Sequence, residues 1–102
     1  MRLPEEVKIG SHPYVIIERK RLRGGDGKPC AGLCSTEQLL ILVEKKLRYA
    51  PTQQLAVFLH EVIHAIEDAR GLTLPEETVQ ALADGLAGFL LDNDMLTWER
   101  GT

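Results

Sequence analysis

Three residues able to do chemistry together stand in the stretch His60-Glu-Val-Ile-His64. Residues four apart on an α-helix are separated by about 40° around its axis, so both imidazoles project to the same side. Two histidine nitrogens can then bind one metal ion at about 2.0–2.1 Å. Glu61 lies beside them and can take a proton from water that the metal activates. This pattern, H-E-x-x-H, predicts a zinc site with His60 and His64 as ligands and Glu61 as the general base.

A reactive zinc site needs a third protein ligand and an open fourth position. The next helical segment offers four candidate side chains, which are Glu76, Glu77, Gln80 and Asp84. Glu76 heads a stripe that continues through Gln80 to two alanines, and small side chains let a neighbouring helix come close. We therefore predict Glu76 as the third ligand, with Glu77 as the alternative. The prediction requires the loop over residues 71–75 to run back along the first helix. Acidic residues also favour a helix start through the helix dipole alone, and this simpler explanation stays open.

Two amphipathic segments are expected to form the helices that position these residues. The first begins at Pro51, where a missing N–H costs nothing, and ends before Gly71. The second begins at Pro75 and fades over residues 92–94. Leucine-rich stripes spaced three and four apart are expected to face the core. In the first helix this stripe is Leu55, Leu59, Val62 and Ile66, and in the second it is Val79, Leu82, Leu86 and Leu90.

The segments before residue 51 favour strands. Residues 14–22 begin with aromatic and β-branched side chains after a turn over residues 10–13, and the apolar run 38–43 is typical of a buried strand. Residues 30–34 are a candidate short strand after a loop over residues 23–29. Strands followed by helices indicate an α+β fold, with a small twisted sheet of about three strands packed on two helices, the first of which carries His60 and His64.

Composition limits the classes of protein that this chain can belong to. Its 102 residues, 44% of them apolar, are expected to form a single domain over residues 1–102. The net charge of −3 argues against a general nucleic-acid binder. No apolar run approaches 18 residues and the N-terminal segment lacks a signal-peptide core, so neither a membrane partner nor export is expected, and we expect the protein to be cytoplasmic.

The two cysteines and a basic cluster are expected to have no separate function. Cys30 and Cys34 are too few for a disulfide framework and have no second cysteine or histidine pair nearby, so we expect reduced thiols. The basic cluster over residues 19–23 is interpreted as a solvated strand end, and no direct nucleic-acid partner is expected.

The residues quoted above resemble those of the gluzincins, the metallopeptidases that combine H-E-x-x-H with a downstream Glu. The size is similar to that of the small single-domain minigluzincins and of the immunity-repressor type of metallopeptidase. That type carries a helix of the form E-x-[EQ]-A-[ND]-x-F-A, which here becomes Glu76-Glu-Thr-Val-Gln-Ala-Leu-Ala83. Glu76 falls on the ligand position and Gln80 on the position that orients a histidine ligand. Thr78, Val79 and Leu82 depart from the pattern, and Gln80 is a weaker match than the Asn or Asp of the pattern. The resemblance covers roughly residues 38–91.

The resemblance implies a peptidase that binds one zinc ion and hydrolyses peptide or protein substrates through a zinc-activated water. The substrate would lie along an edge strand of the sheet, such as residues 30–34. Larger gluzincins steady the transition state with a His or Tyr from a second subdomain, and the visible substitutes here are Tyr49, Tyr14 and His12. A tail over residues 97–102 that blocks the cleft would make the protein a latent enzyme.

The alternative is a non-enzymatic, zinc-stabilised module that binds a protein in the same cleft. A regulatory partner of a DNA-bound repressor is a third and weaker expectation, which rests on the resemblance alone.

Overall fold

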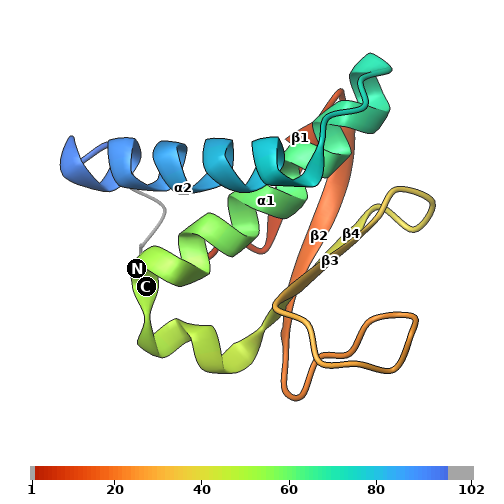
Figure 1. Ribbon diagram of the computed structural model, residues 1–102, viewed down its shortest axis with the longest axis horizontal. Helices are drawn as coiled ribbons and strands as arrows, with labels where there is room; N and C mark the ends of the chain where they lie inside the picture. The colour runs from red at the N-terminus through yellow and green to blue at the C-terminus, as the bar shows by residue number, and fades with distance from the viewer. Residues whose placement is uncertain (1, 97–102) are drawn as a thin grey trace.

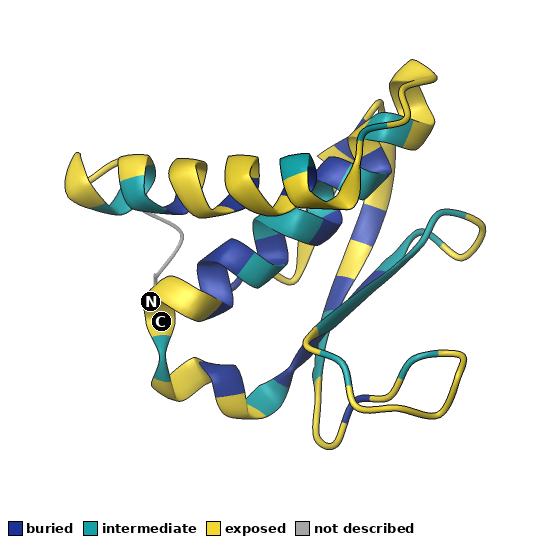
Figure 2. Cartoon of the chain, in the orientation of Figure 1, coloured by how far each residue is buried: buried dark blue, intermediate teal, exposed yellow. Residues whose placement is uncertain are grey.

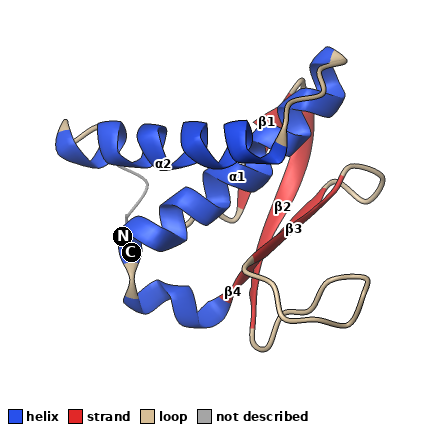
Figure 3. Cartoon of the chain, in the orientation of Figure 1, coloured by secondary structure: helices blue, strands red, loops and turns tan. Residues whose placement is uncertain are grey.

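The computed structural model describes residues 2–96 and places four strands before the helices. Figure 1 shows the sheet on one side of the molecule and the two long helices on the other, and Figure 3 separates the same elements by type. The elements in chain order are β1 (Glu6–Ile9), β2 (His12–Arg19), β3 (Gly32–Ser35), β4 (Leu40–Glu44), the 3-10 helix η1 (Lys45–Tyr49), α1 (Pro51–Arg70) and α2 (Glu76–Asp92). The fold is therefore α+β, as predicted, with one strand more than expected.

The sheet is mixed and has the strand order β1-β2-β4-β3. β2 pairs in parallel with β4, and the two outer pairs are antiparallel. The extra strand, β1, joins β2 through Gly10 and Ser11, whose φ angles of 57° and 71° fit a two-residue hairpin turn with both residues left-handed. We predicted a turn over residues 10–13 and a strand over residues 14–22, but the turn is confined to Gly10 and Ser11, and β2 spans His12–Arg19. We did not predict the four-residue strand β1, which is too short to show a clear alternation.

The strands are buried on one face of the sheet only. Ile41 and Val43 of β4 have no exposed surface, while Leu40 and Leu42, which alternate with them, are partly exposed. The prediction of a fully buried strand at residues 38–43 was therefore wrong about one face. In a sheet with helices on a single side, buried and exposed residues alternate along each strand. In β4 the more exposed positions are also apolar, so the sequence does not show this alternation.

α1 packs across the sheet, and α2 packs on α1 (Figure 1). α1 begins at Pro51 and is capped by Gly71 in the left-handed conformation, both as predicted. α2 buries small residues against its neighbours, since Val79, Ala83 and Ala87 are 0% exposed. The predicted leucine stripe of α2 was wrong for Leu82 and Leu86, which are 46% and 44% exposed. The alanine stripe that carries Glu76 faces inward instead, because it lets the two helices approach closely.

Burial follows this layered arrangement, and in Figure 2 dark, buried segments lie on α1 and on the strands that it covers. The main core joins Tyr14, Ile16 and Ile41 of the sheet to Leu55 and Phe58 of α1. In α1, Leu55 is buried as predicted, but Ile66 of the same stripe is 40% exposed. Within the described residues, no helix has the length and apolar character needed to cross a membrane.

Candidate metal centre

His60 and His64 lie on the middle of α1, and Glu76 is the first residue of α2. One oxygen of the Glu76 carboxylate lies 2.7 Å from His60 Nε2 and 3.3 Å from His64 Nε2. The ligand atoms of these three residues all lie within 4.8 Å of one another. The structure thus brings together the three residues predicted as ligands. Glu77, the predicted alternative, makes no ion pair or hydrogen bond within residues 2–96.

The loop between the helices explains how Glu76 reaches the histidines. It leaves Gly71 and returns along the last turns of α1, where Leu74 N donates a hydrogen bond to Glu67 Oε2 at 2.6 Å. Ile63 of α1 and Val79 of α2 then pack together with Leu74 beside the site. This is the return path that the prediction of Glu76 required.

The donor set suits zinc. Tetrahedral zinc with ligand distances of about 2.0–2.1 Å places its donor atoms about 3.3 Å apart. The separation of His64 Nε2 from the Glu76 oxygen already has this value, and that of His60 Nε2 is shorter at 2.7 Å. The Glu76 side chain is 70% exposed, so it can move outward by the required few tenths of an ångström without disturbing the core. Two neutral imidazoles and one carboxylate are a common zinc ligand set.

Glu67 orients His64, a role that was not predicted from the sequence. Its Oε1 lies 2.7 Å from His64 Nδ1 while its other oxygen accepts from Leu74 N. An ionised carboxylate only accepts, so Nδ1 carries a hydrogen, and in the neutral ring the lone pair that a metal needs is then on Nε2. The available signal was the spacing, because residues three apart on a helix are neighbours on its surface.

Gln80, which the resemblance assigns to orienting a histidine, has another partner in the structure. Its amide donates to Asp84 Oδ1 at 3.0 Å, and His64 donates its hydrogen bond to Glu67 instead. Gln80 nevertheless faces the site, because it lines the cavity described next.

A cavity of about 210 Å³ opens beside His60 and Glu61. Ala31 and Gly32 line it from the sheet, and Val57 and Gln80 line it from the helices. A Cβ at Gly32 would lie 2.9 Å from Glu61 Oε2, so only glycine gives this carboxylate its present room. The outer edge of β3 pairs with no other strand among the described residues, and it borders the cavity.

The electrostatics of the site raise the pKa of Glu61. The side chain is only 8% exposed, and burial is the largest cause of the increase. His60 and His64 act in the opposite direction, and Glu76 adds to the increase. For His64, burial lowers the pKa, but the hydrogen bond with Glu67 and the carboxylates of Glu61 and Glu76 outweigh it and raise the pKa overall.

The remaining candidates lie away from these ligands. Tyr14 is buried in the sheet, Tyr49 is 87% exposed at the end of η1, and His12 is exposed at the start of β2. None of the three lines the cavity beside Glu61. The tail over residues 97–102, predicted to be able to block the cleft, lies outside the described residues.

Both cysteines are free thiols and are held in the protonated form at neutral pH. Burial raises the pKa of Cys34 to about 11, and it also raises the pKa of Cys30. Neither belongs to the group of His60, His64 and Glu76.

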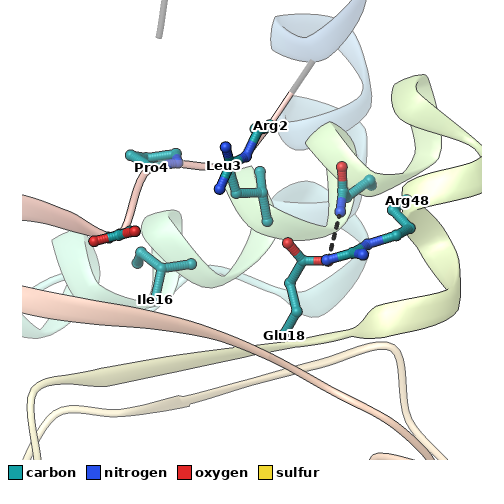
Figure 4. A pocket seen from close by; sticks show the side chains of 8 residues that line it. Arg2, Leu3, Pro4, Ile16, Glu18 and Arg48 are labelled. Atoms are coloured by element: carbon teal, nitrogen blue, oxygen red, sulfur yellow. Dashed lines mark hydrogen bonds and ion pairs between the residues drawn. The ribbon is translucent and has the colours of Figure 1, made fainter. Parts of the chain in front are cut away.

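A separate cavity of about 410 Å³ lies where the N-terminal segment meets α1 (Figure 4). Its polar wall is a small network in which Glu18 Oε1 accepts from Arg48 Nε at 3.1 Å and from Gln54 Nε2 at 3.4 Å. None of the three proposed ligands lines this cavity, so its size does not bear on the metal centre.

Comparisons with known proteins give no assignment. No protein-family model matches the chain, and neither a curated protein nor a solved structure is significantly similar to it.

Proposed function

We propose that the protein is a zinc-dependent peptidase. The observation that carries this proposal is the convergence of His60, His64 and Glu76 beside the buried carboxylate of Glu61, at the edge of a cavity. The resemblance to the minimal gluzincins agrees with the same four residues.

Three residues would bind the metal, and a fourth would transfer the proton. His60, His64 and Glu76 would hold the zinc ion, which when bound supplies a Lewis acid that polarises the scissile carbonyl and activates water. Glu61 would accept the proton of the attacking water and pass it to the leaving amine. A carboxyl whose pKa is raised by burial suits both steps, because it can hold the proton between them.

The substrate would bind as an extended segment along the free edge of β3. No strand of residues 2–96 pairs with this edge, and Gly32 brings β3 close to Glu61. A peptide added here would have its backbone beside the proposed general base.

The first experiment measures zinc in the purified protein by elemental analysis. We expect about one zinc per chain, with loss of zinc in His60→Ala and retention in Glu77→Ala, the matched change on the neighbouring residue. An apo protein that takes up no zinc when it is supplied, or a His60→Ala variant that keeps it, would contradict the metal site.

The second experiment tests the general base. We expect Glu61→Gln to retain zinc and to lose at least about 100-fold of peptide hydrolysis in an assay with a quenched-fluorescence peptide library. Hydrolysis at the wild-type rate in this variant would show that Glu61 is not the base.

A non-enzymatic peptide-binding module is the second candidate. Among the described residues, the cavity beside Glu61 is lined by no Tyr, Arg or additional His that could stabilise a transition state, and Gln80 is its nearest polar substitute. Zinc binding and peptide binding without turnover, in both the wild type and Glu61→Gln, would favour this candidate.

A further inference from the structure

The basic residues of this acidic protein are concentrated at one end of the sheet. Eight of its twelve Lys and Arg residues lie within residues 19–28 and 45–48. The helical part, residues 51–96, holds eight acidic residues and a single basic one, Arg70. The net charge of −3 therefore averages two regions of opposite sign, and it does not describe the local potential at either of them.

The basic end contains a cavity of about 320 Å³, formed where the turn after β2 meets η1. Its lining residues are Lys20, Arg21, Glu44, Lys45, Lys46, Arg48 and Tyr49. Of the five cationic side chains, only Arg48 has an ion-pair partner among residues 2–96, which is Glu18 at 3.1 Å. Four cationic side chains thus line one concave surface without an ion-pair partner in the described part of the chain.

The one carboxylate in the cavity wall, that of Glu44, already accepts hydrogen bonds from the backbone. Glu44 is 8% exposed, and its oxygens accept from Leu22 N at 2.8 Å and from Lys46 N at 3.3 Å. The backbone of Arg21 has a φ of 54°, a conformation that glycine or asparagine would adopt more easily. The turn therefore presents a cationic side chain at a position where the backbone favours a smaller residue.

The exposed ring of Tyr49 distinguishes between the kinds of anion that this cavity could bind. Its side chain is 87% exposed beside the cations, and an exposed aromatic ring next to a basic surface can stack on an unpaired base. A carboxylate-rich peptide would use the cations but would gain nothing from the ring. The cavity volume of about 320 Å³ lies within the range of small-ligand pockets. Its only helical element, η1, has five residues and is too short to lie along the groove of a duplex.

We propose that this cavity binds a single strand of nucleic acid, with phosphates at Lys20, Arg21, Lys45 and Lys46 and a base stacked on Tyr49. The chemistry required, a phosphodiester backbone with unpaired bases, is common to DNA and RNA. The proposal is independent of the metal centre, since none of these residues takes part in it.

The test is fluorescence anisotropy of the full chain with fluorescein-labelled dT12 and rU12. Four phosphate contacts on a single strand predict a log–log salt slope near −2.8, which is about a 50-fold loss of affinity between 50 and 200 mM salt. Tyr49→Ala should weaken binding about tenfold, and Tyr49→Phe should preserve it, because both the ring and its stacking remain. Unequal affinity for dT12 and rU12 would identify which strand is preferred.

The matched control separates the local site from the overall charge. Lys45→Ala with Lys46→Ala should make the salt slope shallower by about 1.4, whereas Lys8→Ala with Arg70→Ala changes the net charge equally and should leave the affinity unchanged. Equal losses in the two double variants would overturn the proposal. It would also be overturned if polyglutamate competed as well as dT12 while Tyr49→Ala bound normally, because the surface would then be a general anion attractor.

Discussion

Glu67 uses the two oxygens of one carboxylate to hold two parts of the candidate metal centre. One oxygen fixes the ring of His64, and the other fixes the backbone of the loop that delivers Glu76. Its side chain is only 12% exposed, so water competes little for either bond. Positioning of this kind controls metal affinity without direct contact with the metal.

We therefore expect Glu67→Ala to weaken zinc binding about 10–100-fold. Isothermal titration with a competing chelator measures this affinity, and urea unfolding of the zinc-free protein measures stability separately. Glu67→Gln, which keeps one acceptor oxygen, should fall between the wild type and the alanine variant. Unchanged zinc affinity in a folded Glu67→Ala protein would exclude a positioning role.

At the scale of elements, the face of α2 that packs against the rest of the protein is its alanine-rich face and not the face that carries Leu82 and Leu86. The inward face consists of Val79, Ala83 and Ala87, and the larger Leu82 and Leu86 point toward solvent.

We expect Ala83→Leu to cost about 1–3 kcal/mol of unfolding free energy, because the helices cannot separate without moving Glu76. Leu82→Ala should change it by no more than about 0.5 kcal/mol. Urea unfolding of the two variants measures both values, and a larger loss for Leu82→Ala would contradict this helix orientation.

Glu44 joins the turn after β2 to the start of η1, and this connection depends on pH. Its pKa is lowered from 4.5, mainly by the hydrogen bond from Leu22 N and also by that from Lys46 N, against a smaller opposing effect of burial. A carboxyl whose pKa is lower in the folded state stabilises the fold at pH values above 4.5, and this contribution is lost as the pH falls through the folded-state value.

The expected result is a melting temperature that falls more steeply below pH 4.5 in the wild type than in Glu44→Gln. Differential scanning calorimetry across the pH range from neutral to about 3 follows this difference. Glu37→Gln is the control, since Glu37 is an exposed carboxyl without a hydrogen bond in the described part of the chain. Parallel curves for the wild type and Glu44→Gln would show that the carboxylate does not link these elements.

The sequence predicted the parts of the fold that depend on local patterns. The limits of α1 follow from Pro51 and Gly71, and the positions of His60, Glu61 and His64 follow from helical spacing. The approach of Glu76 to the histidines was also predicted, from the alanine stripe that it heads and from a loop after Gly71 that can run back along α1. β1, the parallel pairing of β2 with β4 and the inward face of α2 depend on tertiary packing, which a four-residue strand or a stripe of alanines does not reveal.

At the scale of the whole molecule, the charges divide the protein into two regions. The acidic helices carry the candidate metal centre, and the basic end of the sheet carries the cavity with Tyr49. Composition gives only the sum of these charges, since residues 19–28 and 45–48 are separated in sequence and are brought together by the pairing of β2 with β4. The local potential could therefore be recognised only after the strands were placed.

The hydrogen bond from Leu74 N to Glu67 makes one backbone amide a reporter of the metal centre. An amide hydrogen exchanges with solvent deuterium only while its hydrogen bond is open. The partner of this amide also holds His64, so a ligand that immobilises His64 keeps the bond closed for longer. Slower deuterium uptake at Leu74 would thus record occupancy of the site from a loop residue that has no ligand atom of its own.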